Sequence, residues 1–210
     1  MLDLGPPAEV LLHADGQLLV YDKPSGLLSV PAKPPGPADC LEARARAAFP
    51  EALLVHRLDR DTSGVMVFAR TRLAQRHLGW QFERRQVAKV YAARVAGEAV
   101  AEAGRIELPM ICDWPNRPKQ MVCHIRDKPA VTDWRVVARE AGATRLELRP
   151  LTGRSHQLRV HLAAIGHPIL GDPFYGDAEA AERLQLHAAR IGFRHPDGGA
   201  WIEFAAEVPF

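Results

Sequence analysis

The sequence predicts an α+β fold with a largely antiparallel sheet, and three patterns indicate it. Some apolar segments are short and continuous, as VMVFAR is at residues 65–70, which is typical of buried strands. Others alternate apolar with charged residues, as in residues 144–150, which is typical of a strand with one solvated face. Longer segments with apolar residues at helical spacing, such as residues 71–86, predict helices.

The first half of the chain predicts two strands and two helices. QLLVYD at residues 17–22 predicts a strand, and the loop that follows, residues 23–37, is dense in proline and glycine. A helix is predicted at residues 38–49, and the continuous apolar run at residues 65–70 predicts a strand covered on both faces. In the helix predicted at residues 71–86, the apolar positions i, i+4 and i+8 are Ala74, Leu78 and Phe82, beside Leu73.

The second half predicts further strands and one helix. In KVYAARV, residues 89–95, period-two alternation puts Tyr91 on one face with the alanine and the valine two and four residues later. Further strands are predicted at residues 131–139, 144–150, 186–193 and 201–205. The helix predicted at residues 155–165 ends before Gly166, a stop signal, and its apolar stripe is Leu158, Leu162 and Ile165.

The composition is that of a soluble globular protein, with 47% apolar and 25% charged residues. We expect one domain over residues 1–210 and a monomer. No run approaches the roughly 18 apolar residues of a membrane helix, and the N-terminal segment lacks the pattern of a signal peptide. The three cysteines are widely spaced and predict neither a zinc site nor disulfides, so we expect a cytoplasmic protein.

Positive charge is concentrated in the middle of the chain. Residues 57–94 hold nine Lys/Arg against three Asp/Glu, whereas residues 1–22 hold four acids and no Lys/Arg. Residues 177–210 are acidic as well, with six acids and three bases. A basic middle of this kind suits a polyanion such as a nucleic acid, although a solvated arginine-rich surface would give the same pattern.

Sequence signatures of common cofactor and metal sites are missing. GxGxxG, GxxxxGK[ST], HExxH and GxSxG do not occur, so we expect no cofactor and no metal. His156 and His161 are five residues apart and would not share a helical face as zinc ligands do. We expect these two histidines to contact solvent or phosphate beside a helix start.

The loop HRLDRDTSG, residues 56–64, places Asp59 between Arg57 and Arg60. Nearby positive charge favours the ionised carboxylate, which could be a nucleophile, a base or an electrostatic stabiliser of a sugar cation. The alternative is that Asp59 or Asp61 only caps the turn. The loop by itself leaves both interpretations open.

A second cluster, TGRSHQLRVH at residues 152–161, places Gly153 and Arg154 just before a predicted helix start. Free N–H groups and the helix dipole favour an anion there. Arg154 could pair with Asp59 across the fold or with an RNA phosphate. The alternative is a helix with a basic rim.

These motifs together resemble those of one enzyme family. HRLDRDTSG, the KVY of residues 89–91 and GRSHQLRVH from Gly153 resemble the motif set of the RluA family of pseudouridine synthases, as does KPSGLLSVP at residues 23–31. ICDWPNRPKQ, residues 111–120, resembles a narrower subgroup of that family. Other branches carry an N-terminal S4 RNA-binding domain, and we expect none here because 22 residues precede Lys23.

The resemblance implies the pseudouridine synthase fold, with a long, mixed but mostly antiparallel sheet and an active cleft between the sheet halves. It also implies a reaction on RNA without cofactor or metal. The N1–C1′ bond of a uridine breaks, and the uracil turns in the pocket and rejoins through C5. Chemistry on a stacked base requires flipping that base out, at a cost of a few kcal/mol.

Site residues are carried over from the family by motif. Asp59 is the implied catalytic aspartate, which either attacks the nucleotide or removes a ribose proton to give a glycal-like intermediate. Tyr91 is implied to stack on the base and to take the C5 proton, and Arg154 to form the ion pair that orients Asp59. Leu158 is implied to form an apolar wall, and Arg57 to fill the gap in the RNA stack. The residues expected to contact RNA are therefore His56, Arg57, Arg60 and Leu158.

The narrower resemblance implies two substrates, a tRNA anticodon stem-loop at uridine 32 and a 23S rRNA stem-loop at uridine 746. The nearest alternative is a relative that acts on only one of these RNAs. A catalytically silent RNA-binding protein would keep the arginines but would need neither Asp59 nor Tyr91. A hydrolase that releases uracil would need a second acid beside Asp59, and none stands out in the sequence.

Overall fold

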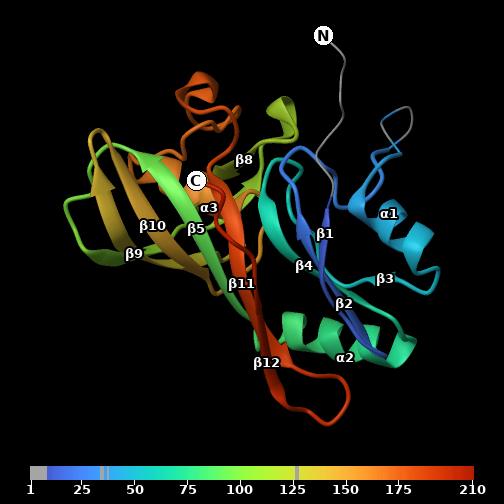
Figure 1. The fold of residues 1–210 in the computed structure, drawn as a ribbon. Coiled ribbons are helices and arrows are strands. Elements are labelled where there is room, and N and C mark those ends of the chain that lie inside the picture. Colours follow the sequence, from blue (N-terminus) through green and yellow to red (C-terminus); the bar gives the residue numbers. More distant parts are fainter. Residues whose placement is uncertain (1–8, 34–35, 37, 126–127) are drawn as a thin grey trace. The chain divides into compact units, whose positions relative to one another are not determined.

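The computed structural model describes residues 9–33, 36, 38–125 and 128–210, and Figure 1 shows its fold. The chain forms two compact units: unit 1 consists of Met1–Lys89 and His187–Pro209, and unit 2 of Val90–Leu186 with Phe210. The N-terminal segment tested for a signal peptide and three prolines of the predicted loop, at positions 34, 35 and 37, lie outside the described residues.

Unit 1 is a mixed sheet with two helices. Its elements are β1 (Val10–Ala14), β2 (Leu18–Lys23), α1 (Leu41–Ala48), β3 (Leu53–Leu54), β4 (Ser63–Ala69), α2 (Arg72–Glu83), β11 (Leu186–Arg194) and β12 (Trp201–Ala205). β2 lies between β1 and β4, β3 also pairs with β4, and β12 pairs with β11, all antiparallel. β4 pairs with β11 in parallel, and the isolated bridge between Leu28 and Cys40 is parallel as well.

The core of unit 1 lies on both faces of its sheet. Leu18 and Val20 of β2 pack in one cluster with Leu78 of α2, whereas Leu19 and Tyr21 pack in another with α1. Every residue of β4 is buried, which confirms the prediction of a strand covered on both faces.

Unit 2 is an antiparallel sheet with one helix and a separate hairpin. Its elements are β5 (Ala88–Ala96), β6 (Ala103–Glu107), β7 (Met110–Cys112), η1 (Trp114–Asn116), β8 (Gln120–Val122), β9 (Val131–Glu140), β10 (Ala143–Pro150), α3 (Gln157–Ala164) and η2 (Ala178–Ala180). β10 lies between β5 and β9, and β6 pairs with β9. β7 and β8 pair with each other as a hairpin. The expected α+β class with a mixed, mostly antiparallel arrangement is confirmed.

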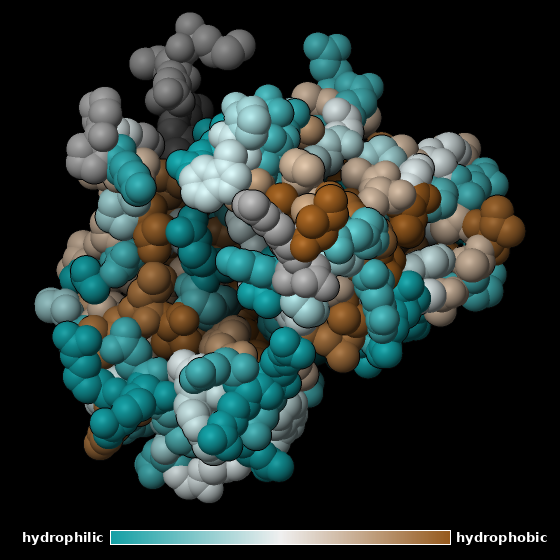
Figure 2. Space-filling view, turned by 180° about the vertical axis from the view of Figure 1, so that it is seen from behind, coloured by the Kyte–Doolittle hydropathy of each residue, from teal (hydrophilic) through white to brown (hydrophobic). Residues whose placement is uncertain are grey.

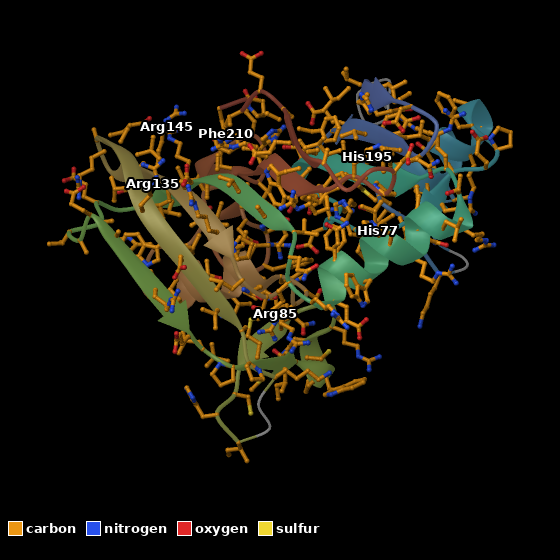
Figure 3. The ribbon with its side chains drawn as sticks, turned by 90° about the horizontal axis from the view of Figure 1, so that it is seen from below. His77, Arg85, Arg135, Arg145, His195 and Phe210 are labelled. Carbon is orange, nitrogen blue, oxygen red and sulfur yellow. The ribbon has the colours of Figure 1, made fainter. Side chains whose placement is uncertain are left out.

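The sheet of unit 2 is apolar on one face and charged on the other. Leu146 and Leu148 of β10 pack with α3 in one core cluster, as the alternation predicts. On the charged face Arg135 pairs with Glu147 at 2.8 Å, and the Arg145 guanidinium reaches the Phe210 carbonyl at 2.5 Å (Figure 3). On the face of the molecule shown in Figure 2, hydrophilic and apolar side chains are interspersed.

The predicted helices are present but shorter than expected. α1 begins at Leu41 because Cys40 bridges to Leu28 in extended conformation and its Sγ then accepts from the backbone N–H of Ala43. α3 ends before Ile165, and the Gly166 N–H and the next N–H close the helix on the carbonyls of residues 163 and 162. None of the helices in the described part of the chain is long and apolar enough to cross a membrane.

Five side chains contradict their predicted environment, and one of them is His156, which was expected at solvent or phosphate but is buried. Leu73 and Ile165, placed with apolar positions, are exposed. His161, expected at solvent or phosphate, is buried, and its ring lies 2.9 Å from Thr132 Oγ1. Arg159 is not part of a basic rim, because it is buried and paired with a carboxylate. An internal partner compensates the desolvation of a buried polar group, and periodicity does not reveal such partners.

Candidate active site

Asp59 lies in the loop between β3 and β4 of unit 1, with its side chain partly exposed. The turn is closed by a backbone bond from Thr62 N–H to the Asp59 carbonyl at 3.2 Å. Arg60 donates from Nε to Asp61 Oδ1 at 2.8 Å. Arg57 and Arg60 are both exposed, as residues that contact RNA must be.

Lys23 fastens the Asp59 loop from inside unit 1. This lysine is fully buried at the end of β2. Its ammonium donates to three backbone carbonyls, those of Pro24 at 2.9 Å, Leu27 at 2.7 Å and Arg60 at 2.8 Å. A buried charge is tolerated only where hydrogen bonds replace its hydration. Lys23 therefore ties the KPSGLLSVP segment to the residue that follows Asp59.

Two serines of the same segment hold the loop on either side of Asp59. Ser25 Oγ donates to the Asp61 carbonyl at 2.7 Å. Ser29 Oγ donates to the Leu58 carbonyl at 2.7 Å and accepts from the Leu58 N–H at 3.0 Å. The backbone is thus fixed at the residue before Asp59 and again two residues after it, which preorganises the carboxylate.

Replacing Lys23 with methionine should destabilise the protein and slow turnover. The change leaves buried carbonyls without a donor, which should lower the free energy of unfolding by about 2–4 kcal/mol. Misplacing the Asp59 loop should lower kcat about ten- to a hundredfold with a smaller change in KM. Urea denaturation and steady-state kinetics measure the two effects. Lys33→Met, at an exposed position of the same unit, is the control and should change neither.

The DTSG end of the loop joins β4 to β11. Ser63 Oγ lies 2.8 Å from His187 Nδ1, and both side chains are buried. Gly64 has φ +114°, and a Cβ atom built on it would lie 2.3 Å from the Ala188 carbonyl oxygen. Only glycine fits this close parallel pairing, because any side chain would collide with the backbone of β11.

His56, predicted to contact RNA, has a role inside the fold. Its Nε2 accepts from the Val67 N–H at 3.0 Å, and its ring stacks on Phe82 with centroids 4.8 Å apart. Burial, with a smaller contribution from the positive charge of Lys89, lowers the pKa of His56 to about 3. At neutral pH its proton is therefore on Nδ1, and His56 offers no charge to a phosphate.

The low pKa of His56 predicts an acid sensitivity. Between pH 6.5 and about 3 the unfolded chain binds a proton at this residue and the folded chain does not, so stability falls as the pH falls. Denaturant titrations at pH 7 and pH 4.5 should show a loss to which His56 contributes about 2 kcal/mol. In His56→Gln, which keeps an acceptor for Val67, the loss should be smaller by that amount. An identical loss in the variant would assign the sensitivity to other groups.

The KVY motif begins in unit 1 and ends in unit 2. Burial lowers the pKa of Lys89 to about 8, and Arg85, labelled in Figure 3 beyond the end of α2, adds to the effect. Tyr91, on β5, packs against the apolar cluster that contains Leu158 of α3. Its predicted place on the face of Ala93 and Val95 is confirmed, because both belong to that cluster.

The GRSHQ segment of unit 2 is held by Gln157, the first residue of α3. The Gln157 Oε1 accepts from Thr152 Oγ1 at 2.7 Å and from the Arg154 N–H at 3.0 Å. Its Nε2 donates to the Val131 carbonyl at 3.0 Å. The Arg154 side chain is exposed, and its Nε donates to the Pro129 carbonyl at a long 3.4 Å. The backbone that carries Arg154 is thus fixed, and the pairing of Arg154 with Asp59 stays a prediction.

Three residues that the sequence did not single out, Arg159, Asp172 and Tyr175, form a polar cluster with His156. Arg159 and Asp172 form a bidentate pair at 2.8 and 2.6 Å, with both side chains buried. The hydroxyl of Tyr175 lies 2.8 Å from Nδ1 of His156, a residue with φ +53°. The sequence contains no periodic signal for the burial of Arg159, because Ser155 and His156 precede it by four and three residues.

Comparisons with known proteins agree with this arrangement. Residues 17–164 match a family model described as RNA pseudouridylate synthase. The dual-specificity RNA pseudouridine synthase RluA of Yersinia pestis is 50% identical, over 96% of this chain and 100% of that protein. The protein of the same name from Escherichia coli strain K12 is 48% identical, over 100% of this chain and 99% of that protein.

A solved structure shows the same fold. Human RNA pseudouridylate synthase domain containing 1 superimposes with a TM-score of 0.82 at 27% identity, over 97% of this chain and 84% of that chain. The pseudouridine synthase fold expected from the motifs is therefore confirmed, and the reaction is an isomerisation within RNA. On the match over residues 17–164 and on the near full-length identity to its relatives, this chain belongs to the RNA pseudouridylate synthase family.

Proposed function

We propose that this enzyme isomerises uridine in two RNAs, at uridine 32 of a tRNA anticodon stem-loop and at uridine 746 in a stem-loop of 23S rRNA. Support comes from the relatives named as dual-specificity enzymes, which align over nearly their whole length. The observation that carries the catalytic part is the Asp59 loop, whose backbone is fixed by Lys23, Ser25 and Ser29 while its carboxylate stays partly exposed.

Three residues act in the reaction under this proposal. Asp59 is the catalytic aspartate and begins glycosidic bond cleavage, either by attack on the nucleotide or by removal of a ribose proton. Tyr91 stacks on the uracil and takes the C5 proton after the base has turned. Arg154 orients the Asp59 carboxylate and keeps it ionised. The fixed backbone around Asp59 and around Arg154 supports these roles, because catalytic groups must be held close to their reactive geometry.

Four residues contact the RNA under this proposal. Arg57 and Arg60 are exposed beside Asp59, and Arg57 stacks where the uridine has left the RNA. Leu158 forms an apolar wall beside Tyr91. His56 contacts RNA through its neutral ring, since it carries no charge at neutral pH. We further propose that residues 1–210 act as one monomeric catalytic domain in the cytoplasm, without cofactor or metal.

A tritium-release assay tests the proposal. Purified protein with EDTA is mixed with either the tRNA anticodon stem-loop or the 23S rRNA stem-loop, each carrying tritium at uridine C5. Exchange of C5–H for the new glycosidic bond releases tritium to water. Release from both RNAs, with pseudouridine in the product, is the expected result.

Other outcomes separate the alternatives. Release from one RNA alone would identify a single-substrate enzyme. Free uracil in the product would identify a hydrolase. Binding of both RNAs without release would identify a catalytically silent protein and would overturn the assignment of Asp59.

A further inference from the structure

One segment that the catalytic roles leave unexplained is DWPNRPKQ, residues 113–120, between β7 and β8 in unit 2 (Figure 1). Trp114 is 68% exposed at the start of η1. The Arg117 guanidinium carbon lies 3.5 Å from the centroid of the Trp114 ring, so the two planar groups form a stacked pair. A tryptophan this exposed has no packing role that would account for it.

The turn that carries the pair is rigid. The backbone N–H of Asp113 donates to the Lys119 carbonyl at 3.0 Å, and the Lys119 N–H donates to the Asn116 carbonyl at 3.0 Å. The Asn116 amide also donates to the Asp113 carboxylate at 3.0 Å. Pro115 fixes φ at the start of η1. Little conformational entropy is therefore lost when a ligand binds the exposed Trp114 ring and the Arg117 guanidinium.

The turn is also fastened to the GRSHQ segment. The Gln120 N–H donates to the hydroxyl of Tyr175 at 2.7 Å, and that hydroxyl lies 2.8 Å from His156 Nδ1. His156 is the residue before the first turn of α3. The stacked pair is thus connected by two hydrogen bonds to the segment that carries Arg154 and that directly precedes Leu158.

We infer that Trp114 and Arg117 form a stacking platform for one unpaired base of the RNA substrate. This inference rests on the proposed function. Exposed aromatic rings and arginine planes bind splayed-out bases by stacking, and the adjacent Lys119 supplies a charge for the phosphate. One exposed aromatic ring and two cationic side chains, Arg117 and Lys119, in the same turn fit a nucleotide better than an apolar peptide. The platform contributes substrate affinity and is not catalytic.

Binding measurements in the Asp59→Asn background test the platform, because this background holds the RNA without turnover. Fluorescence anisotropy with the labelled anticodon stem-loop gives Kd. Trp114→Ala should raise Kd about ten- to a hundredfold, the size expected for one stacked base, and Trp114→Phe should restore most of the affinity. Met121→Ala, an exposed apolar position on the same hairpin, is the matched control and should stay within about twofold.

Abasic RNAs identify the base. Each unpaired nucleotide of the loop is replaced in turn by an abasic site, and Kd is measured with the parent and with Trp114→Ala. At one position the abasic site should weaken binding to the parent and have no further effect on the variant. Additive losses at every position, or a Trp114→Ala Kd within about twofold of the parent, would overturn the inference.

The outcomes keep the two proposals apart. Wild-type protein that makes pseudouridine, with normal binding by a Trp114→Ala variant of unchanged melting temperature, would reject the platform alone. Wild-type protein that neither binds nor modifies either stem-loop would reject the proposed substrates and the platform with them.

Discussion

Replacing Asp59 with asparagine is expected to lower turnover by about a thousandfold or more while leaving RNA affinity within about threefold. A group that takes part in bond breaking contributes several kcal/mol to the barrier, and each 1.36 kcal/mol is tenfold in rate. The amide is nearly isosteric, so the loop held by Lys23 and Ser29 should keep its backbone. Single-turnover tritium release and anisotropy with the same stem-loop measure the two quantities.

The neighbouring carboxylate provides the control for this prediction. Asp61 pairs with Arg60 at 2.8 Å and lies two residues after Asp59 in the same turn. The pair is solvent-accessible through Arg60 and contributes little, so Asp61→Asn should change turnover by less than about threefold. Turnover of Asp59→Asn within about tenfold of wild type would reject the catalytic assignment.

The second large effect concerns stability and comes from Arg159. Its guanidinium and the Asp172 carboxylate bury two charges with side-chain exposures of 2% and 0%. Arg159→Met leaves Asp172 buried without its counter-charge, which should lower the free energy of unfolding by about 3–5 kcal/mol. Adding Asp172→Asn should recover part of the loss, since the lone charge is removed while an acceptor remains for the Phe174 and Tyr175 N–H groups. Urea denaturation of the singles and the double variant gives the coupling energy.

An exposed pair in the same unit is the comparison. Arg105 donates to Asp133 from Nε at 2.6 Å and from Nη2 at 2.9 Å, but this pair lies on the solvated face. Arg105→Met should therefore lower the free energy of unfolding by less than about 1 kcal/mol. Arg154→Ala, at an exposed site, should keep the stability within about 0.5 kcal/mol and lose activity. Arg159→Ala should instead lower the free energy of unfolding. The two arginines of one motif are therefore distinguished by which quantity changes, activity for Arg154 and stability for Arg159. Equal losses of stability in Arg105→Met and Arg159→Met would contradict the role of burial.

Patterns with a clear period were enough to predict the main elements. The alternation in β10 and the continuous apolar run of β4 predicted both the strands and their burial. Strands of two or three residues, such as β3 and β7, contain too few residues to show a period. The start of α1 was misplaced because Cys40 first extends to pair with Leu28, a contact between distant residues.

The motifs predicted where chemistry would take place but not how the loops are held. Lys23 acts on backbone carbonyls, which every residue has, so no complementary side chain marks its partner in the sequence. A basic rim was only one of the alternatives that the sequence left open for this helix, and arginine is mostly exposed, so burial of Arg159 was not predicted. Its burial depends on Asp172, which reaches it through a loop whose course the sequence does not specify.

The parallel pairing of β4 with β11 has a consequence for synthesis on the ribosome. Ser63 and its partner His187 are 124 residues apart, and Gly64 fits only against the backbone of β11. At roughly 5–20 residues per second, about 6–25 s pass between the synthesis of the two segments. During that interval the strand after Asp59 exposes an unpaired, apolar edge, which nascent chains can use for misassociation. The sheet of unit 1 is therefore completed only after residues 90–186 of unit 2 have been synthesised, and the edge of β4 stays open until then.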